Sequence, residues 1–205
     1  MNLLTQNTKL KKTSNINNAK IFNFSIPAYK SKTGKITCPF AKDCVKYCYA
    51  QKGNYTRFPI VQELMEKKYQ LTKTPEFINL MNKEIIKKKC THVRIHDSGD
   101  FYSVKYLLKW LQIAKDNSKV IFYAYTKSIS FFKVSLKKMG IKLPNNFKVI
   151  FSFGSKQDDL INTKTDRHAL IFDNIKELIN KSYINASEND LNAITNNRNV
   201  GLVYH

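Results

Sequence analysis

The sequence predicts an α/β fold, an open, partial parallel barrel of about six strands with helices packed on it. Short apolar runs typical of strands alternate with amphipathic helical stretches over nearly the whole chain, which favours a parallel sheet with right-handed crossovers. About six strands in 205 residues are too few for a closed eight-stranded barrel of about 250 residues. The scarcity of glycine (6) and proline (5) argues against a linker-rich or low-complexity chain.

The chain is expected to form a single α/β domain behind a flexible arm. Residues 1–20 are polar, basic and aperiodic, which predicts a flexible basic arm. Residues 21–26 then alternate apolar and polar side chains as a strand does, and Pro27 ends this strand. A cysteine loop follows at residues 37–53, inside the domain predicted for residues 21–205.

The remaining elements continue the alternation of strands and helices. Apolar side chains at helical spacing predict helices at residues 58–71, 76–88, 104–115, 129–138 and 175–179. Short apolar runs predict strands at residues 92–96, 120–125, 147–153, 168–172 and 200–204. No internal repeat or domain boundary interrupts this order.

Polar side chains on the predicted strands share one face of the sheet. Both faces of a parallel strand are normally buried, so polar residues within such strands are informative. Alternation along the strands places these residues together: Arg94, His96, Tyr123, Tyr125 and Ser152. We expect a site here, because sites in such folds gather at the carboxyl ends of the strands. The alternative is that these groups satisfy one another as a buried network.

Three of the four cysteines lie in an eleven-residue window with the spacing C-x5-C-x3-C: Cys38, Cys44 and Cys48. Thiolates this close repel one another unless a metal or an iron–sulfur cluster holds them. Three ligands without a nearby fourth favour a [4Fe-4S] cluster that leaves one iron open. Structural zinc completed by Cys90 or a histidine is the alternative, and free thiols are a third. We expect Cys90 to be a small buried hydrophobe instead of a ligand.

The chain is expected to work in a reducing cytoplasm and not in a membrane. Residues 1–12 are polar and basic and do not resemble a signal peptide, which argues against an oxidising compartment and a disulfide framework. No apolar stretch is long enough to cross a bilayer.

The charge balance favours a polyanionic partner. The chain has 35 Lys and Arg residues against 15 Asp and Glu residues, a net charge of +20. Such an excess favours nucleic acid as the partner, and the alternative is a solvated lysine surface. The residues expected to contact phosphates flank the motif loops or lie in the arm: Lys42, Lys46, Lys52, Arg57, Lys127, Lys9, Lys11 and Lys12.

Four motifs resemble the phage-encoded gene product 88 family, and the similarity runs from about Ile26 to His205. They are Cys38-Pro39-Phe40-Ala41 with Cys44, Cys48-Tyr49-Ala50, residues 94–102 and residues 122–128. More remotely, the layout resembles radical S-adenosylmethionine enzymes, which carry a three-cysteine loop after the first strand of a partial barrel. The spacing common among those enzymes is C-x3-C-x2-C, whereas this chain has C-x5-C-x3-C. Their usual turn has two glycines, an acidic residue and a proline, whereas the turn at the matching place here is Ser98-Gly99-Asp100.

The second resemblance implies that Cys38, Cys44 and Cys48 ligate three irons and that the fourth iron takes S-adenosylmethionine. Cofactor contacts are then expected from Tyr47, Ser98, Gly99 and Asp100. Catalytic roles are expected for His96, Asp97 and Tyr125. Substrate contacts are expected from Arg94, Tyr123, Ser152 and Lys127.

Two functions of different classes follow from these observations. The first is a radical S-adenosylmethionine-like enzyme that acts on a nucleic acid or nucleotide and needs an electron donor. The second is a non-enzymatic iron–sulfur or zinc protein that binds nucleic acid during phage infection, in the host cytoplasm. Conversion of S-adenosylmethionine to 5′-deoxyadenosine by the reduced protein discriminates between them.

Overall fold

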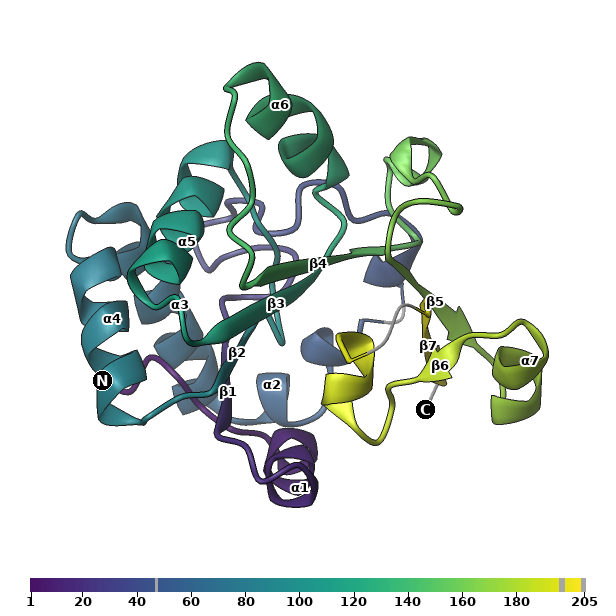
Figure 1. The fold of residues 1–205 in the computed structure, drawn as a ribbon. Coiled ribbons are helices and arrows are strands. Elements are labelled where there is room, and N and C mark those ends of the chain that lie inside the picture. The colour runs from purple at the N-terminus through teal and green to yellow at the C-terminus, as the bar shows by residue number, and fades with distance from the viewer. Residues whose placement is uncertain (47, 196–197, 204–205) are drawn as a thin grey trace.

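Seven parallel strands form one curled sheet in the computed structural model, which describes residues 1–46, 48–195 and 198–203 (Figure 1). The strands lie in the order β1-β2-β3-β4-β5-β7-β6, and the neighbouring pairs are parallel. Their bounds are β1 Ile21–Phe24, β2 His92–Ile95, β3 Ile121–Thr126, β4 Phe147–Ser152, β5 His168–Phe172, β6 Ile184–Asn185 and β7 Val200–Val203. The sheet is an open half-barrel, which confirms the predicted partial parallel barrel and adds the short strand β6.

The helices largely follow the expected ranges. Their bounds are α1 Thr8–Ile16, α2 Asn54–Arg57, α3 Pro59–Lys73, α4 Phe77–Lys87, α5 Val104–Asp116, α6 Leu136–Lys138 and α7 Ile175–Asn180. The helix expected at residues 129–138 is a π-helical segment, Phe131–Ser135, followed by the short α6. Within the described ranges, no helix combines the length and the apolar character needed to span a bilayer.

The larger hydrophobic core lies between the convex face of the sheet and α3, α4 and α5, which Figure 1 shows together on one side of the sheet. Trp110 of α5 is fully buried at the centre of this core. Its ring lies 5.3 Å from that of Phe24 and 5.5 Å from that of Phe77, and both pairs are edge-to-face. Such aromatic pairs contribute about 0.5–1.5 kcal/mol each beyond their burial. The core fixes β1 and β2, whose carboxyl ends carry the candidate site.

The concave face of the half-barrel is covered by α1 and by a short 3-10 helix, η5 Asp190–Ala193. A second core joins Leu10 of α1 and Leu191 of η5 to Ile21, Tyr123 and Ile150 of the strands. The sheet therefore buries both faces, as parallel strands normally do.

The expectation of a flexible arm at residues 1–20 is wrong for its larger part. Asn7 caps α1 by accepting a hydrogen bond from the backbone amide of Leu10. Leu3 and Leu4 are buried in the larger core, and their backbone amides each donate to the Glu84 carboxylate at 2.8 Å. These leucines are too widely spaced in a polar segment to give a periodic pattern, yet their burial anchors the segment.

Candidate functional site

The cysteine loop lies across the carboxyl ends of the central strands. The backbone amide of Asp100, after β2, donates to the carbonyl of Thr37 at 3.2 Å. The amide of Lys42 donates to the carbonyl of Gly154, just after β4, at 3.2 Å. The loop is thereby fixed at both sides of β3, at the end of the sheet where sites in α/β folds form.

The three loop thiols lie close enough to act electrostatically on one another, and all three residues are half-buried. Cys38 Sγ accepts a hydrogen bond from the amide of Tyr29 at 3.4 Å. Burial raises the pKa of Cys38 well above its ordinary value. Burial also raises the pKa of Cys44, although the Lys127 ammonium opposes this shift. The thiols of Cys38 and Cys44 therefore remain protonated unless a bound cation stabilises their thiolate forms.

The donor set of the loop suits a thiophilic metal centre, but the thiols do not form a ligand shell here. In the part of the chain that the structure describes, no three His, Cys, Asp or Glu side chains are arranged to hold a metal ion. Binding would require the loop to tighten around the metal. Cys90 lies away from the loop, in the larger core, and burial raises its pKa to about 12. Tyr47, expected to contact the cofactor, lies outside the described residues.

Asp100 and Lys127 link the turn after β2 to the end of β3. The buried Asp100 carboxylate accepts from the amide of Phe101 at 2.7 Å, the hydroxyl of Thr126 at 2.6 Å and the amide of Lys127 at 2.8 Å. Burial raises the pKa of Asp100 in spite of these hydrogen bonds. Lys127 Nζ donates to Ser152 Oγ at 2.7 Å, which brings these two expected substrate residues together beside the cysteine loop.

The turn expected to bind S-adenosylmethionine packs on the end of β1. Ser98 Oγ donates to the carbonyl of Ile26 at 3.0 Å, and the amide of Ile26 donates to the carbonyl of Ser98 at 3.1 Å. Gly99 has φ +83°, and a Cβ there would lie 2.3 Å from Ile26 Cγ1. Only glycine suits this close approach. The hydroxyl and the carbonyl of Ser98 thus already have protein partners, and cofactor binding by this turn stays a prediction.

Asp97 joins the cysteine loop to the concave face of the sheet. Its carboxylate accepts from Tyr55 Oη at 2.5 Å and from Asn7 Nδ2 at 3.1 Å. Tyr49, which follows the third cysteine, donates to the backbone carbonyl of Asp97. Arg94 NH1 lies 3.7 Å from the Asp97 carboxylate. Sequence reasoning placed Asp97 in the site but missed both tyrosines, whose nearness to the cysteines was the available signal.

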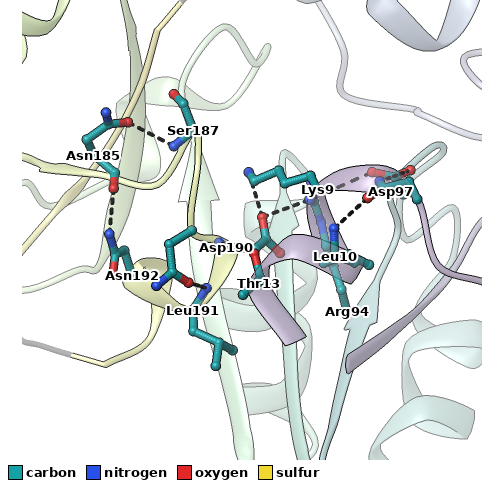
Figure 2. A network of polar contacts seen from close by, with 12 residues as sticks. Lys9, Leu10, Thr13, Arg94, Asp97, Asn185, Ser187, Asp190, Leu191 and Asn192 are labelled. Atoms are coloured by element: carbon teal, nitrogen blue, oxygen red, sulfur yellow. Dashed lines mark hydrogen bonds and ion pairs between the residues drawn. The ribbon is translucent and has the colours of Figure 1, made fainter. Parts of the chain in front are cut away.

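Asp190 organises a second group of buried charges, shown in Figure 2. Its fully buried carboxylate lies 2.8 Å from Lys9 Nζ and 2.9 Å from Arg94 NH1, and it accepts from Tyr123 Oη at 2.5 Å. Its backbone amide donates to Thr13 Oγ1 at 3.1 Å. Burial alone would raise the pKa of Asp190, but Arg94 and Lys9 hold it below its ordinary value. Arg94 and Tyr123 therefore belong to a buried network, the alternative that the sequence left open.

His96 does not share the face of Arg94, contrary to expectation. Strand β2 ends at Ile95, and His96 has φ +68°, which ends the strand alternation. Its buried ring lies against Phe101, with centroids 4.8 Å apart, and its Nε2 lies 2.9 Å from Tyr106 Oη. Burial lowers the pKa of His96 to about 3. The ring is thus a neutral part of the larger core, on the convex side.

Tyr125 lies on the concave face as predicted, with the Arg94 guanidinium 5.2 Å from its ring centre. Its hydroxyl is buried without a hydrogen-bond partner among the described residues. Of the three expected catalytic residues, Asp97 and Tyr125 therefore lie near the site and His96 does not.

The outer surface of the cysteine loop region is basic. The exposed lysines of residues 27–53 are Lys30, Lys32, Lys35, Lys42, Lys46 and Lys52. Two large aromatic side chains lie beside them, Tyr49 with 56% and Phe58 with 45% of its surface exposed. The Arg57 guanidinium lies 5.7 Å from the Phe58 ring centre. This surface combines the cationic and aromatic groups that bind single-stranded nucleic acids.

Comparison with known proteins supports the first resemblance. The chain is 33% identical over 102 residues to the Gene 88 protein of Mycobacterium phage L5 and, equally, to that of Mycobacterium phage D29. The match covers 44% of this chain and 43% and 42% of the two phage proteins, so it spans less than half of either relative. No solved structure matches the chain. The model of the family described as Gene product 88 matches residues 1–204, and the chain therefore belongs to the Gene product 88 family.

Proposed function

We propose that this phage protein carries an iron–sulfur cluster on its cysteine loop and binds nucleic acid on the basic surface around that loop. The observation that carries the proposal is the cysteine loop itself, which is tied by backbone hydrogen bonds to the carboxyl end of an open parallel sheet. We further propose the host cytoplasm as its place of action, because thiols stay reduced there.

Cys38, Cys44 and Cys48 would hold the cluster, and Lys127 would lie beside it. Their thiols are half-buried, and raised pKa values keep Cys38 and Cys44 protonated until a cation binds. A bound cluster would supply electron transfer and, through an iron without a protein ligand, a coordination site for a small molecule. Zinc is the competing occupant, since it takes the same thiolate donors.

Iron retention in cysteine variants tests the metal part of the proposal. Cys38→Ser, Cys44→Ser and Cys48→Ser should each lose most of the iron of the anaerobically purified protein. Cys90→Ala is the matched control and should keep the wild-type iron content, because Cys90 lies in the larger core. Iron loss in Cys90→Ala, or full retention in Cys44→Ser, contradicts the assignment.

The nucleic-acid part rests on the exposed lysines and aromatics of the loop surface. Phosphate contacts make affinity fall with salt, with a log–log slope of about −0.9 for each phosphate neutralised on duplex DNA and about −0.7 on single strands. Changing Lys42, Lys46 and Lys52 to glutamine should weaken binding of a labelled oligonucleotide and make the slope shallower. Lys83 and Lys87 of α4 serve as controls, since α4 covers the convex face of the sheet. Equal effects of both sets of changes would indicate a general lysine surface without a defined site.

An S-adenosylmethionine-dependent enzyme is the second candidate, favoured by the cysteine loop at the carboxyl end of a half-barrel. Its substrate would be a nucleic acid or nucleotide, and it would need an electron donor. The test is to reduce the iron-loaded protein, add S-adenosylmethionine and measure 5′-deoxyadenosine. Formation of this product only with all three loop cysteines present supports the enzyme, and its absence leaves the binding protein as the function.

A further inference from the structure

Two hydrogen-bond donors on the concave face are buried without a partner in the described part of the chain, Tyr125 Oη and Arg94 Nε. They belong to neighbouring strands, β3 and β2, and the guanidinium of Arg94 lies 5.2 Å from the ring centre of Tyr125. Buried polar groups in native proteins nearly always have a partner. Two such donors on neighbouring strands therefore point to an acceptor that is supplied from outside the chain.

The Tyr125 hydroxyl lies among charged groups of both signs. Asp190 acts on it as an anion, and Arg94 and Arg167 act on it as cations. The Asp190 carboxylate is already engaged by Lys9 and Tyr123 as well as by Arg94. Burial raises the pKa of Tyr125, which keeps its hydroxyl a neutral donor at physiological pH.

Two residues that act electrostatically on Tyr125, Arg167 and Tyr49, reach the surface of the protein. Arg167 also lines an open hollow of about 280 Å³, together with residues 163–166 and Asn199. Tyr49, which also acts electrostatically on Tyr125, has an exposed ring beside the cysteine loop.

We infer that the concave face binds an oxyanion group, a phosphate or a carboxylate, through Tyr125 Oη and Arg94 Nε. Guanidinium and hydroxyl donors form strong charge-assisted hydrogen bonds with such groups. The site lies on the face covered by α1 and η5 and is separate from the exposed lysines of the cysteine loop. The inference does not depend on a metal at the cysteines.

The test uses the full chain and two probes, inorganic phosphate and acetate, with chloride at equal ionic strength as the reference. Thermal unfolding should show stabilisation by at least one oxyanion beyond that by chloride, and the better probe identifies the class of ligand. In Tyr125→Phe the fitted affinity for that probe should fall at least about 10-fold, as expected for a lost hydrogen bond to a charged group.

A matched pair of variants separates ligand binding from a structural role. Tyr125→Phe should be at least as stable as the wild type without anion, because its hydroxyl has no partner to lose. Tyr123→Phe should be less stable, because its hydroxyl donates to Asp190 at 2.5 Å. The inference is overturned if Tyr125→Phe is destabilised like Tyr123→Phe, if its response to the oxyanions equals that of the wild type, or if neither oxyanion exceeds chloride.

Discussion

Replacing Asp190 with asparagine should destabilise the protein strongly, because it removes a fully buried charge that pairs with two cations. Lys9 Nζ lies 2.8 Å and Arg94 NH1 2.9 Å from this carboxylate. Asparagine preserves the shape and can still accept from Tyr123, so the loss reports mainly on charge. Removing a partner of a buried ion pair costs about 3–5 kcal/mol. A protein of this size loses about 2–4 °C in Tm per kcal/mol, so the expected fall is about 6–20 °C.

Urea denaturation followed by far-UV circular dichroism measures the free energy of unfolding, with Glu188→Gln as the control. Glu188 lies two residues away and faces Lys12 at 3.6 Å, but the two side chains are 75% and 59% exposed. An exposed pair of this kind contributes less than about 1 kcal/mol. Adding Lys9→Met to Asp190→Asn should recover part of the loss, since it removes one of the two cations left unpaired.

The pH dependence gives a second check on Asp190. Its pKa in the folded protein is below the ordinary value of about 3.9, so the stabilisation is fully present above that pH and is lost as the pH falls through the lower folded value. The stability difference between wild type and Asp190→Asn should thus be constant from about pH 5 to 8. A difference under about 1 kcal/mol at pH 7, or one that shrinks already near pH 6, would refute the reasoning.

Three further changes test other parts of the fold, each by urea denaturation. Burial lowers the pKa of His96 to about 3, so the free energy of unfolding should fall by about 1.4 kcal/mol for each pH unit below about pH 6.5. His96→Gln should lack this fall, and an unchanged pH dependence in the variant would count against the buried neutral ring. Burial in α3 lowers the pKa of Lys68 to about 8. Lys68→Met should therefore raise the free energy of unfolding by up to about 3 kcal/mol at pH 7, and this gain should shrink above pH 8. A lower free energy of unfolding of the variant at pH 7 would contradict the prediction. Gly99→Ala should lower the free energy of unfolding by about 2–5 kcal/mol, because Gly99 has a positive φ and a Cβ there would meet Ile26. Gly140 also has a positive φ but open space around its Cβ, so Gly140→Ala should lower it by only about 1–2 kcal/mol. Equal losses in the two variants would contradict the packing argument.

Regular patterns made the sheet and its polar face predictable from the sequence. Each central strand is a short apolar run between turn residues, and the alternation of strands with helices indicated parallel pairing. The side-chain period of two then placed Arg94, Tyr123 and Tyr125 together, as the structure has them.

Features that depend on a single dihedral angle or a distant partner were not predictable. One positive φ at His96 ends the alternation and sends its ring to the other face of the sheet. Asp190 meets Arg94 across 96 residues of sequence, from a polar segment without any periodic pattern. The order of α1 depends on the burial of Leu3, Leu4 and Leu10, which only the folded chain reveals.

The metal content of the anaerobically purified wild-type protein tests the central proposal most directly. Iron, acid-labile sulfide and zinc per chain are counted on the same sample, together with its visible absorbance spectrum before and after reduction. A cluster on Cys38, Cys44 and Cys48 predicts about four irons and four sulfides per chain, with absorbance near 400 nm that bleaches on reduction. About one zinc per chain without sulfide, or a colourless protein without metal after reconstitution with iron and sulfide, would contradict the proposal.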